Sequence, residues 1–160
     1  MKEYHGQKHK KVFICSPFRP KGETAGQRAD DLRHNRQRAR LACEYAVSHG
    51  YLPLAPHLFF PTFLAEDVPG ERELGIQFGL EWLSECDELW IIGRRITEGM
   101  KREIAAAKEM NIPVAQHILC QEVEGSLLDQ FFRKQPHSAD PGYEEDTSYY
   151  HKEDDEEVPF

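Results

Sequence analysis

Residues 86–114 have the sequence CDELWIIGRRITEGMKREIAAAKEMNIPV and decide how the chain folds. Residues 89–92 form a short apolar run, which suits a strand that is buried on both faces of a sheet. Thr97 is a suitable N-cap for the helix that follows, and Pro113 prevents that helix from extending further. A second apolar run begins at Val114. The stretch therefore predicts a strand, a loop, a helix and a second strand.

The helix expected after Thr97 carries a carboxylate, Glu103, without a local partner. The apolar face of this helix is formed at helical spacing by Met100, Ile104 and Ala107. Glu103 follows Met100 by three residues, so it lies on or beside this face. Glu98 has basic residues three and four positions further on and is expected to form an exposed ion pair, whereas Glu103 has none at either spacing. Glu103 is therefore either part of a site at the end of a parallel strand or a solvated residue at the edge of the face.

The whole chain alternates between buried strands and amphipathic helices. Strands are predicted at residues 12–15, 51–55, 89–92 and 114–119, and helices at 28–49, at 70–85 and between Thr97 and Asn111. This alternation predicts an α/β fold, a flavodoxin-like or Rossmann-like three-layer sandwich with a parallel sheet of four to five strands. A ligand is expected at the carboxyl ends of the strands.

The charge of the chain is unevenly distributed. The formal net charge is −8, and nine acids against one lysine from Asp140 onward account for all of it. We therefore expect a flexible terminus at residues 1–10, a domain at 11–135 that contains a short helix at 127–132, and a disordered acidic tail at 136–160. Because the remainder is formally neutral, we expect no nucleic acid partner.

Several kinds of site have no signature in the sequence. No apolar run is long enough to span a membrane, and the histidines lack metal-binding spacing such as HxxxH. The four cysteines form no CxxC pair and are expected to be reduced. Residues 21–27 match neither GxGxxG nor a P-loop. We therefore expect a cytoplasmic protein with no membrane partner, no metal and no cofactor.

Several polar and aromatic residues fall in the loops at the predicted ligand-binding edge. The turn after the first strand contains Ser16, Pro17, Phe18 and Arg19. Asn35 falls on the inner stripe of its helix, so it either points into a pocket or hydrogen-bonds to a loop backbone. Residues 56–64 are expected to form a loop whose three aromatic rings pack on the core or stack on a planar ligand. His57, in this loop, is either an acid–base group or ligand contact, or neither.

Two further features mark the same region. Gly75 and Gly79 lie one helical turn apart, which suggests close approach to another backbone or a ligand. Four basic side chains flank the predicted edge, and they are either phosphate-binding groups or solvated loop charges: Arg19, Lys21, Arg94 and Arg95.

Together these motifs resemble the nucleoside 2-deoxyribosyltransferase-like superfamily, which includes the deoxynucleoside-5′-monophosphate N-glycosidases. The similar segments are VFICSPF at residues 12–18, DELWII at 87–92, TEGMKREI at 97–104 and IPV at 112–114. They occur in the same order as in the family. The resemblance is nearest to a branch of uncharacterised domains of the DUF4406 and DUF7768 kind. It implies the same α/β fold and, for many members, assembly into a dimer or larger oligomer.

The resemblance also implies roles for particular residues. It implies that Glu103 is the nucleophile that attacks the anomeric carbon of a deoxynucleoside or its monophosphate. It implies sugar or phosphate contacts from the first turn and from the helix start: Ser16, Pro17, Phe18, Arg19, Asn35, Thr97, Gly99 and Met100. Gly79 stands where the glycosidases have a second acid, so Asp87 or His57 is the alternative proton donor. The rival function is a non-catalytic nucleotide-binding or protein-interaction module.

Overall fold

The computed structural model describes residues 8–119, and residues 1–7 and 120–160 lie outside the described part. The described strands are β1 (Lys11–Cys15), β2 (Leu52–Leu54), β3 (Glu88–Ile92) and β4 (Val114–His117). All pair in parallel in the order β2-β1-β3-β4. This confirms the predicted α/β fold. The expected helix at 127–132 and the acidic tail at 136–160 fall outside the described residues.

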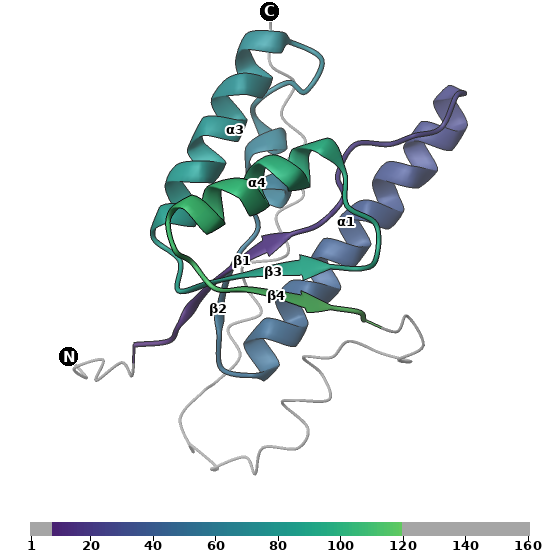
Figure 1. The fold of residues 1–160 in the computed structure, drawn as a ribbon. Coiled ribbons are helices and arrows are strands. Elements are labelled where there is room, and N and C mark those ends of the chain that lie inside the picture. Colours follow the sequence, from purple (N-terminus) through teal and green to yellow (C-terminus); the bar gives the residue numbers. More distant parts are fainter. Residues whose placement is uncertain (1–7, 120–160) are drawn as a thin grey trace, which may run out of the picture.

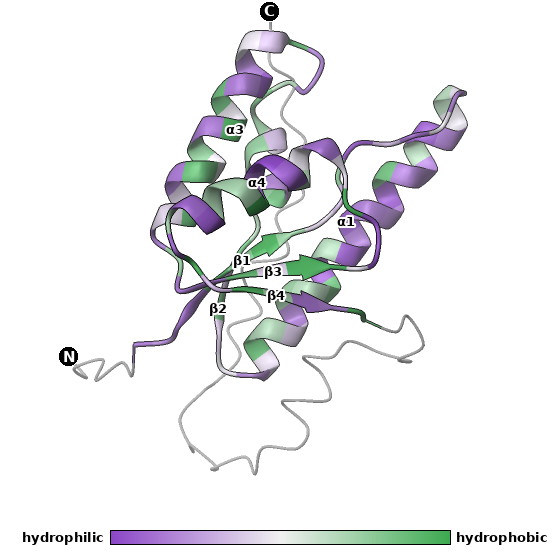
Figure 2. Cartoon of the chain, in the orientation of Figure 1, coloured by the Kyte–Doolittle hydropathy of each residue, from purple (hydrophilic) through white to green (hydrophobic). Residues whose placement is uncertain are grey.

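The two central strands are buried on both faces, which makes the molecule a three-layer sandwich (Figure 1). On one face, Phe13, Leu89 and Ile91 pack against helices α3 (Pro69–Ser84) and α4 (Glu98–Glu109). On the other face, Val12, Ile14, Trp90 and Ile92 pack against helix α1 (Ala25–Ser48). Figure 2 shows both central strands as hydrophobic and much of α1 as hydrophilic. The strands therefore need cover on both sides, and the helices provide it.

Helix α1 begins three residues before the predicted start at residue 28. The Thr24 hydroxyl accepts a hydrogen bond from the Gln27 backbone, and the Gln27 side chain accepts one from the Thr24 backbone. This capping box satisfies N–H groups that a helix start would otherwise leave unpaired. The earlier start carries α1 beyond the carboxyl edge of the sheet, alongside the loop that follows β1 (Figure 1).

The expectation that residues 56–64 form a loop is wrong. They form a short helix, α2 (Pro56–Phe59), and a 3₁₀ turn, η1 (Phe60–Thr62). Pro56 and Pro61 each stand at the start of one of these elements, where a fixed φ favours helical geometry. Phe60 is buried, and its ring centroid lies 4.8 Å from that of Trp82 on α3. Phe60 thus packs on α3, as one of the two sequence interpretations proposed, whereas Phe59 and Phe63 remain exposed.

Helix α4 forms as expected from the sequence. Thr97 is its N-cap, and the Thr97 hydroxyl accepts a hydrogen bond from the Met100 backbone. Met100 and Ala107 are buried, while Asn111 adopts a positive φ of 56° just after the helix. Among the helices of the described part, none is both long and apolar enough to cross a membrane.

Candidate active site

A cavity of about 480 Å³ opens at the carboxyl ends of β1 and β3, on the face of the sheet covered by α3 and α4. Its walls come from the β1–α1 loop, from α2 and η1, from α3, and from the β3–α4 loop with the first turns of α4. This is the edge at which parallel α/β sheets bind ligands. Its volume is within the range of small-molecule sites.

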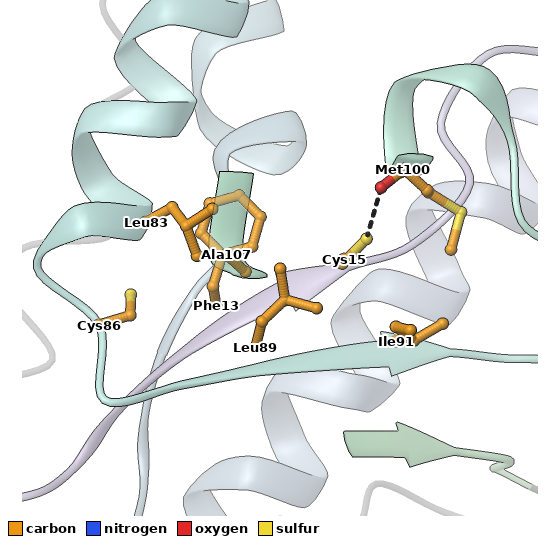
Figure 3. Close-up of a cluster of buried hydrophobic side chains, with 8 residues drawn as sticks. All are labelled: Phe13, Cys15, Leu83, Cys86, Leu89, Ile91, Met100 and Ala107. Atoms are coloured by element: carbon orange, nitrogen blue, oxygen red, sulfur yellow. Dashed lines mark hydrogen bonds between the residues drawn. The ribbon is translucent and has the colours of Figure 1, made fainter. Parts of the chain in front are cut away.

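Glu103 lines this cavity from α4 and is partly buried. Desolvation raises the pKa of the Glu103 carboxyl to about 7, and a hydrogen bond with the Cys15 thiol opposes part of this rise. Cys15, at the end of β1, is fully buried beneath α4, and its thiol also lies 3.9 Å from the Met100 carbonyl oxygen (Figure 3). Glu103 is therefore placed in a poorly solvated position rather than at a solvated edge of the helix.

Ser16 and His57 meet across the cavity wall, although 41 positions separate them in sequence. The Ser16 Oγ lies 2.8 Å from the His57 Nε2, and the Phe18 ring centroid is 5.9 Å from that of the imidazole. Desolvation lowers the pKa of His57 to about 4. The imidazole is therefore neutral near pH 7 and is a poor proton donor there.

Asn35 does not line the cavity, and its side chain instead hydrogen-bonds to the β1–α1 loop, which forms one wall of the cavity. The Asn35 Nδ2 donates hydrogen bonds to the Phe18 carbonyl at 3.0 Å and to the Arg19 carbonyl at 3.5 Å. One turn earlier on α1, Asp31 accepts hydrogen bonds from the backbones of Lys21 and Gly22, which are the largest cause of its lowered pKa. The prediction that Asn35 contacts a ligand is replaced by the other interpretation, a hydrogen bond to a loop backbone.

The remaining predicted site residues lie in three places: the cavity described above, a second cavity, and the amino ends of the strands. Ser16, Phe18, Arg19, His57, Thr97, Gly99, Met100 and Glu103 all line the one cavity. Pro17 and Arg94 line a second cavity instead. Asp87 precedes β3, and its carboxylate accepts a hydrogen bond of 2.7 Å from the Lys11 backbone at the start of β1. This places Asp87 at the amino ends of the strands, so we no longer assign it a catalytic role.

Sequence reasoning missed two charged residues of the cavity, Glu66 and Arg72, which face each other at 3.9 Å. They lie in and after the η1–α3 loop, and no local spacing connected them to the sheet edge. Gly75 and Gly79 both line the cavity, and side chains rather than another backbone lie next to them within the described residues. A Cβ on Gly79 would lie 3.5 Å from that of Pro56, and one on Gly75 would lie 3.5 Å from Leu64.

The ion pairs of α4 differ from those expected in one respect. Glu98 pairs with Lys101, while Arg102 reaches across to Glu73 on α3 at 3.3 Å. The tertiary pairing links two helices that both line the cavity. Within residues 8–119, no group of three His, Cys, Asp or Glu side chains is arranged to hold a metal ion.

The sequence and the fold were compared with those of known proteins. None of the curated proteins matches the sequence. A similar solved structure is that of the 2-deoxyribosyltransferase from the psychrotolerant bacterium Bacillus psychrosaccharolyticus, with 17% identity over 75% of this chain and 80% of that chain, and a TM-score of 0.49. The family described as "Domain of unknown function (DUF7768)" matches residues 10–117, so the chain belongs to the DUF7768 family.

Proposed function

We propose that this protein cleaves or transfers the N-glycosidic bond of a deoxynucleoside or its 5′-monophosphate, with Glu103 as the nucleophile. The observation that carries the proposal is the position of Glu103, a partly buried carboxyl that lines a cavity of about 480 Å³ and has a pKa raised to about 7. A carboxylate with a strongly shifted pKa in such a cavity is typical of a functional site. The sequence motifs around it support the same chemistry.

The chemistry follows from the charge that develops at the sugar. Breaking the bond between the anomeric carbon and the base nitrogen creates an oxocarbenium-like centre, which the Glu103 carboxylate stabilises and then traps as an ester. The departing base nitrogen must take up a proton. Water, or the nitrogen of a second base, then displaces the carboxylate from the anomeric carbon. Glu103 acts in its ionised form, so activity should rise with pH as this group titrates near pH 7.

Catalysis requires a group that protonates the leaving base, whereas a non-catalytic nucleotide-binding module does not. Gly79 supplies no carboxyl, and His57 is neutral near pH 7 because its pKa is about 4. Glu66 also lines the cavity, but Arg72 faces it at 3.9 Å and an ion-paired carboxylate donates a proton poorly, so we name no proton donor among the described residues. If no group protonates the base, the protein binds nucleotides without turning them over. The glycine at position 79 favours that second candidate function.

Release of free base from a panel of deoxynucleosides and monophosphates tests the proposal. Glu103→Gln retains the shape and polarity of the side chain but removes its charge, so base release should fall by about two orders of magnitude or more, or roughly 3 kcal/mol of transition-state stabilisation. Glu109→Gln is the matched control, because Glu109 lies exposed at the end of the same helix. We expect it to leave the rate within a few-fold.

Three outcomes are distinguishable. Loss of base release in the Glu103 variant alone supports the proposal. Equal losses in both variants would point to damage to α4 rather than to chemistry. Binding of a nucleotide by the wild type without any base release would favour the binding module.

A further inference from the structure

A second cavity, of about 460 Å³, lies at the same carboxyl edge but on the opposite face of the sheet. It is bounded by Arg38 and Leu41 of α1, by Ile92 at the end of β3, and by the loop that follows β3. Ile92 belongs to the hydrophobic cluster on the α1 side, whereas Met100 of the first cavity belongs to the cluster on the α3 and α4 side. The two cavities are therefore separate spaces, one on each face.

The walls of this second cavity are basic, and its floor is apolar. Three arginines line it, namely Arg38, Arg94 and Arg95, and none of the described residues that line it is acidic. Pro17, Leu41, Ile92 and Leu119 supply the apolar surface. Asp31 interacts electrostatically with Arg95 but does not line this cavity, so the excess of positive charge in the cavity rests mainly on Arg38 and Arg94.

Neighbouring arginines on α1 make the contrast clear. Arg33 pairs with Asp30 at 3.0 Å, and Arg40 pairs with Glu44 at 3.6 Å. Within the described residues, Arg38 has no carboxylate within 4.0 Å, although it lies on the same helix and is partly buried. Guanidinium groups that face a cavity without such partners attract an anion, and their planar fork matches the oxygens of phosphate.

We propose that this second cavity binds a phosphorylated small molecule, with the phosphate held by the three arginines and the remainder of the ligand on the apolar floor. The volume suits a ligand of about nucleotide size. The site would be additional to the one proposed for Glu103, and the inference does not depend on the glycosidic chemistry.

Arg95 gives the second cavity a connection to the first. Arg95 lines both cavities, and the loop that carries it leads directly into Thr97 and the start of α4. A phosphate that draws Arg95 into the second cavity removes a positive charge from the first. Occupation of the second cavity should therefore weaken the binding of an anionic ligand in the first cavity, and by linkage the reverse should also hold.

Calorimetric titration of the full chain with inorganic pyrophosphate tests the proposal. Arg38 lines the second cavity alone, so Arg38→Gln should weaken pyrophosphate binding by about tenfold or more, since charge-assisted hydrogen bonds are lost. Arg36→Gln is the matched control, because Arg36 is exposed on the same helix and lines neither cavity. It removes the same charge and should change the affinity less than twofold.

A second pair of measurements separates the alternatives. Arg19 lines only the first cavity, so pyrophosphate that binds in the second cavity should be insensitive to Arg19→Gln. Sensitivity to Arg19→Gln but not to Arg38→Gln would overturn the proposal, as would equal losses in the Arg36 and Arg38 variants or no binding at all. If pyrophosphate binds only after residues 137–160 are removed, the acidic segment is the occupant and the proposal fails. None of these readouts depends on base release.

Discussion

Glu103 and His57 line the same cavity, and desolvation shifts their pKa values in opposite directions. Burial penalises the charged form of each group, so it raises the pKa of the carboxyl to about 7 and lowers that of the imidazole to about 4. Near neutral pH the cavity therefore contains a neutral histidine and a carboxyl poised between its two forms. The proposed nucleophile thus has a cost in folding stability that a neutral substitute would avoid.

Glu103→Gln should raise the free energy of unfolding at pH 8 by about 1–2 kcal/mol. The pKa of Glu103 is raised on folding, so the folded state gains most from the proton at low pH and loses that advantage as pH rises through about 7. The stabilisation by Gln should therefore be largest at pH 8 and should vanish below about pH 4.5, where the carboxyl is protonated in both states. Urea denaturation at the two pH values measures the difference, with Glu109→Gln as control. An equal gain at both values would contradict the assigned pKa.

At the scale of elements, α3 and α4 both line the cavity, and they contribute unequally to its chemistry. Helix α4 supplies Glu103, whereas the nearest part of α3 supplies the glycines Gly75 and Gly79. Gly79 is buried, and a Cβ at this position would make ordinary van der Waals contact with Pro56. A Cβ can therefore be placed there without a clash.

Gly79→Asp should increase base release by about tenfold or more if protonation of the leaving base limits the reaction, because a positioned general acid contributes at least that much. Gly79→Asn has nearly the same shape but cannot donate a carboxyl proton, so it should not accelerate the reaction. Rates for the two variants, each first shown to be folded by circular dichroism, make the comparison. Equal rates for Asp and Asn would mean that another group already supplies the proton.

At the scale of the whole molecule, the basic residues at the carboxyl edge form two groups on opposite faces of the sheet. Arg19 and Lys21 line only the first cavity, Arg38 and Arg94 line only the second, and Arg95 lines both. The basic loop residues that flank this edge are therefore divided between two cavities.

We expect deoxynucleoside monophosphates to bind more tightly than the corresponding deoxynucleosides, with a preference that weakens as salt is added. Arg19→Gln should reduce this preference, whereas Arg36→Gln, on the exposed side of α1, should leave it unchanged. Calorimetry at low and high ionic strength measures both effects. Equal affinities for nucleoside and monophosphate would remove the phosphate role of the first cavity.

Removal of residues 137–160 should change the thermal midpoint by no more than about 2 °C. This segment is rich in charged residues and poor in aliphatic ones, so it gains too little from burial to offset the entropy of ordering. A change in stability below roughly 0.5 kcal/mol moves the midpoint of a domain of this size by that amount. A much larger fall in a calorimetric scan would mean that its tyrosines pack on the folded domain.

The sequence by itself determined the four described strands, the three long helices and their arrangement in layers. The central strands are recognisable as apolar runs, and α4 by the helical spacing of Met100 and Ala107. Both patterns can be read from the sequence because the spacing of apolar residues shows which face of an element is buried. The Thr97 cap could also be predicted, since capping is a contact between residues three positions apart. The position of Glu103 beside the apolar face could be predicted for the same reason.

Only the tertiary structure decided what these elements bring together. The Ser16–His57 hydrogen bond joins residues 41 positions apart, and the Asn35 amide bonds the carbonyl of Phe18, 17 positions earlier. Asp87 lies next to β3 in sequence but at the wrong end of the sheet, because a strand separates it from the carboxyl edge. The sharing of Arg95 between two cavities depends on where α1 crosses the sheet. The spacing of apolar residues and the caps of helices depend on residues that are close in sequence. The direction and the partners of a loop side chain depend instead on segments that are distant in the chain.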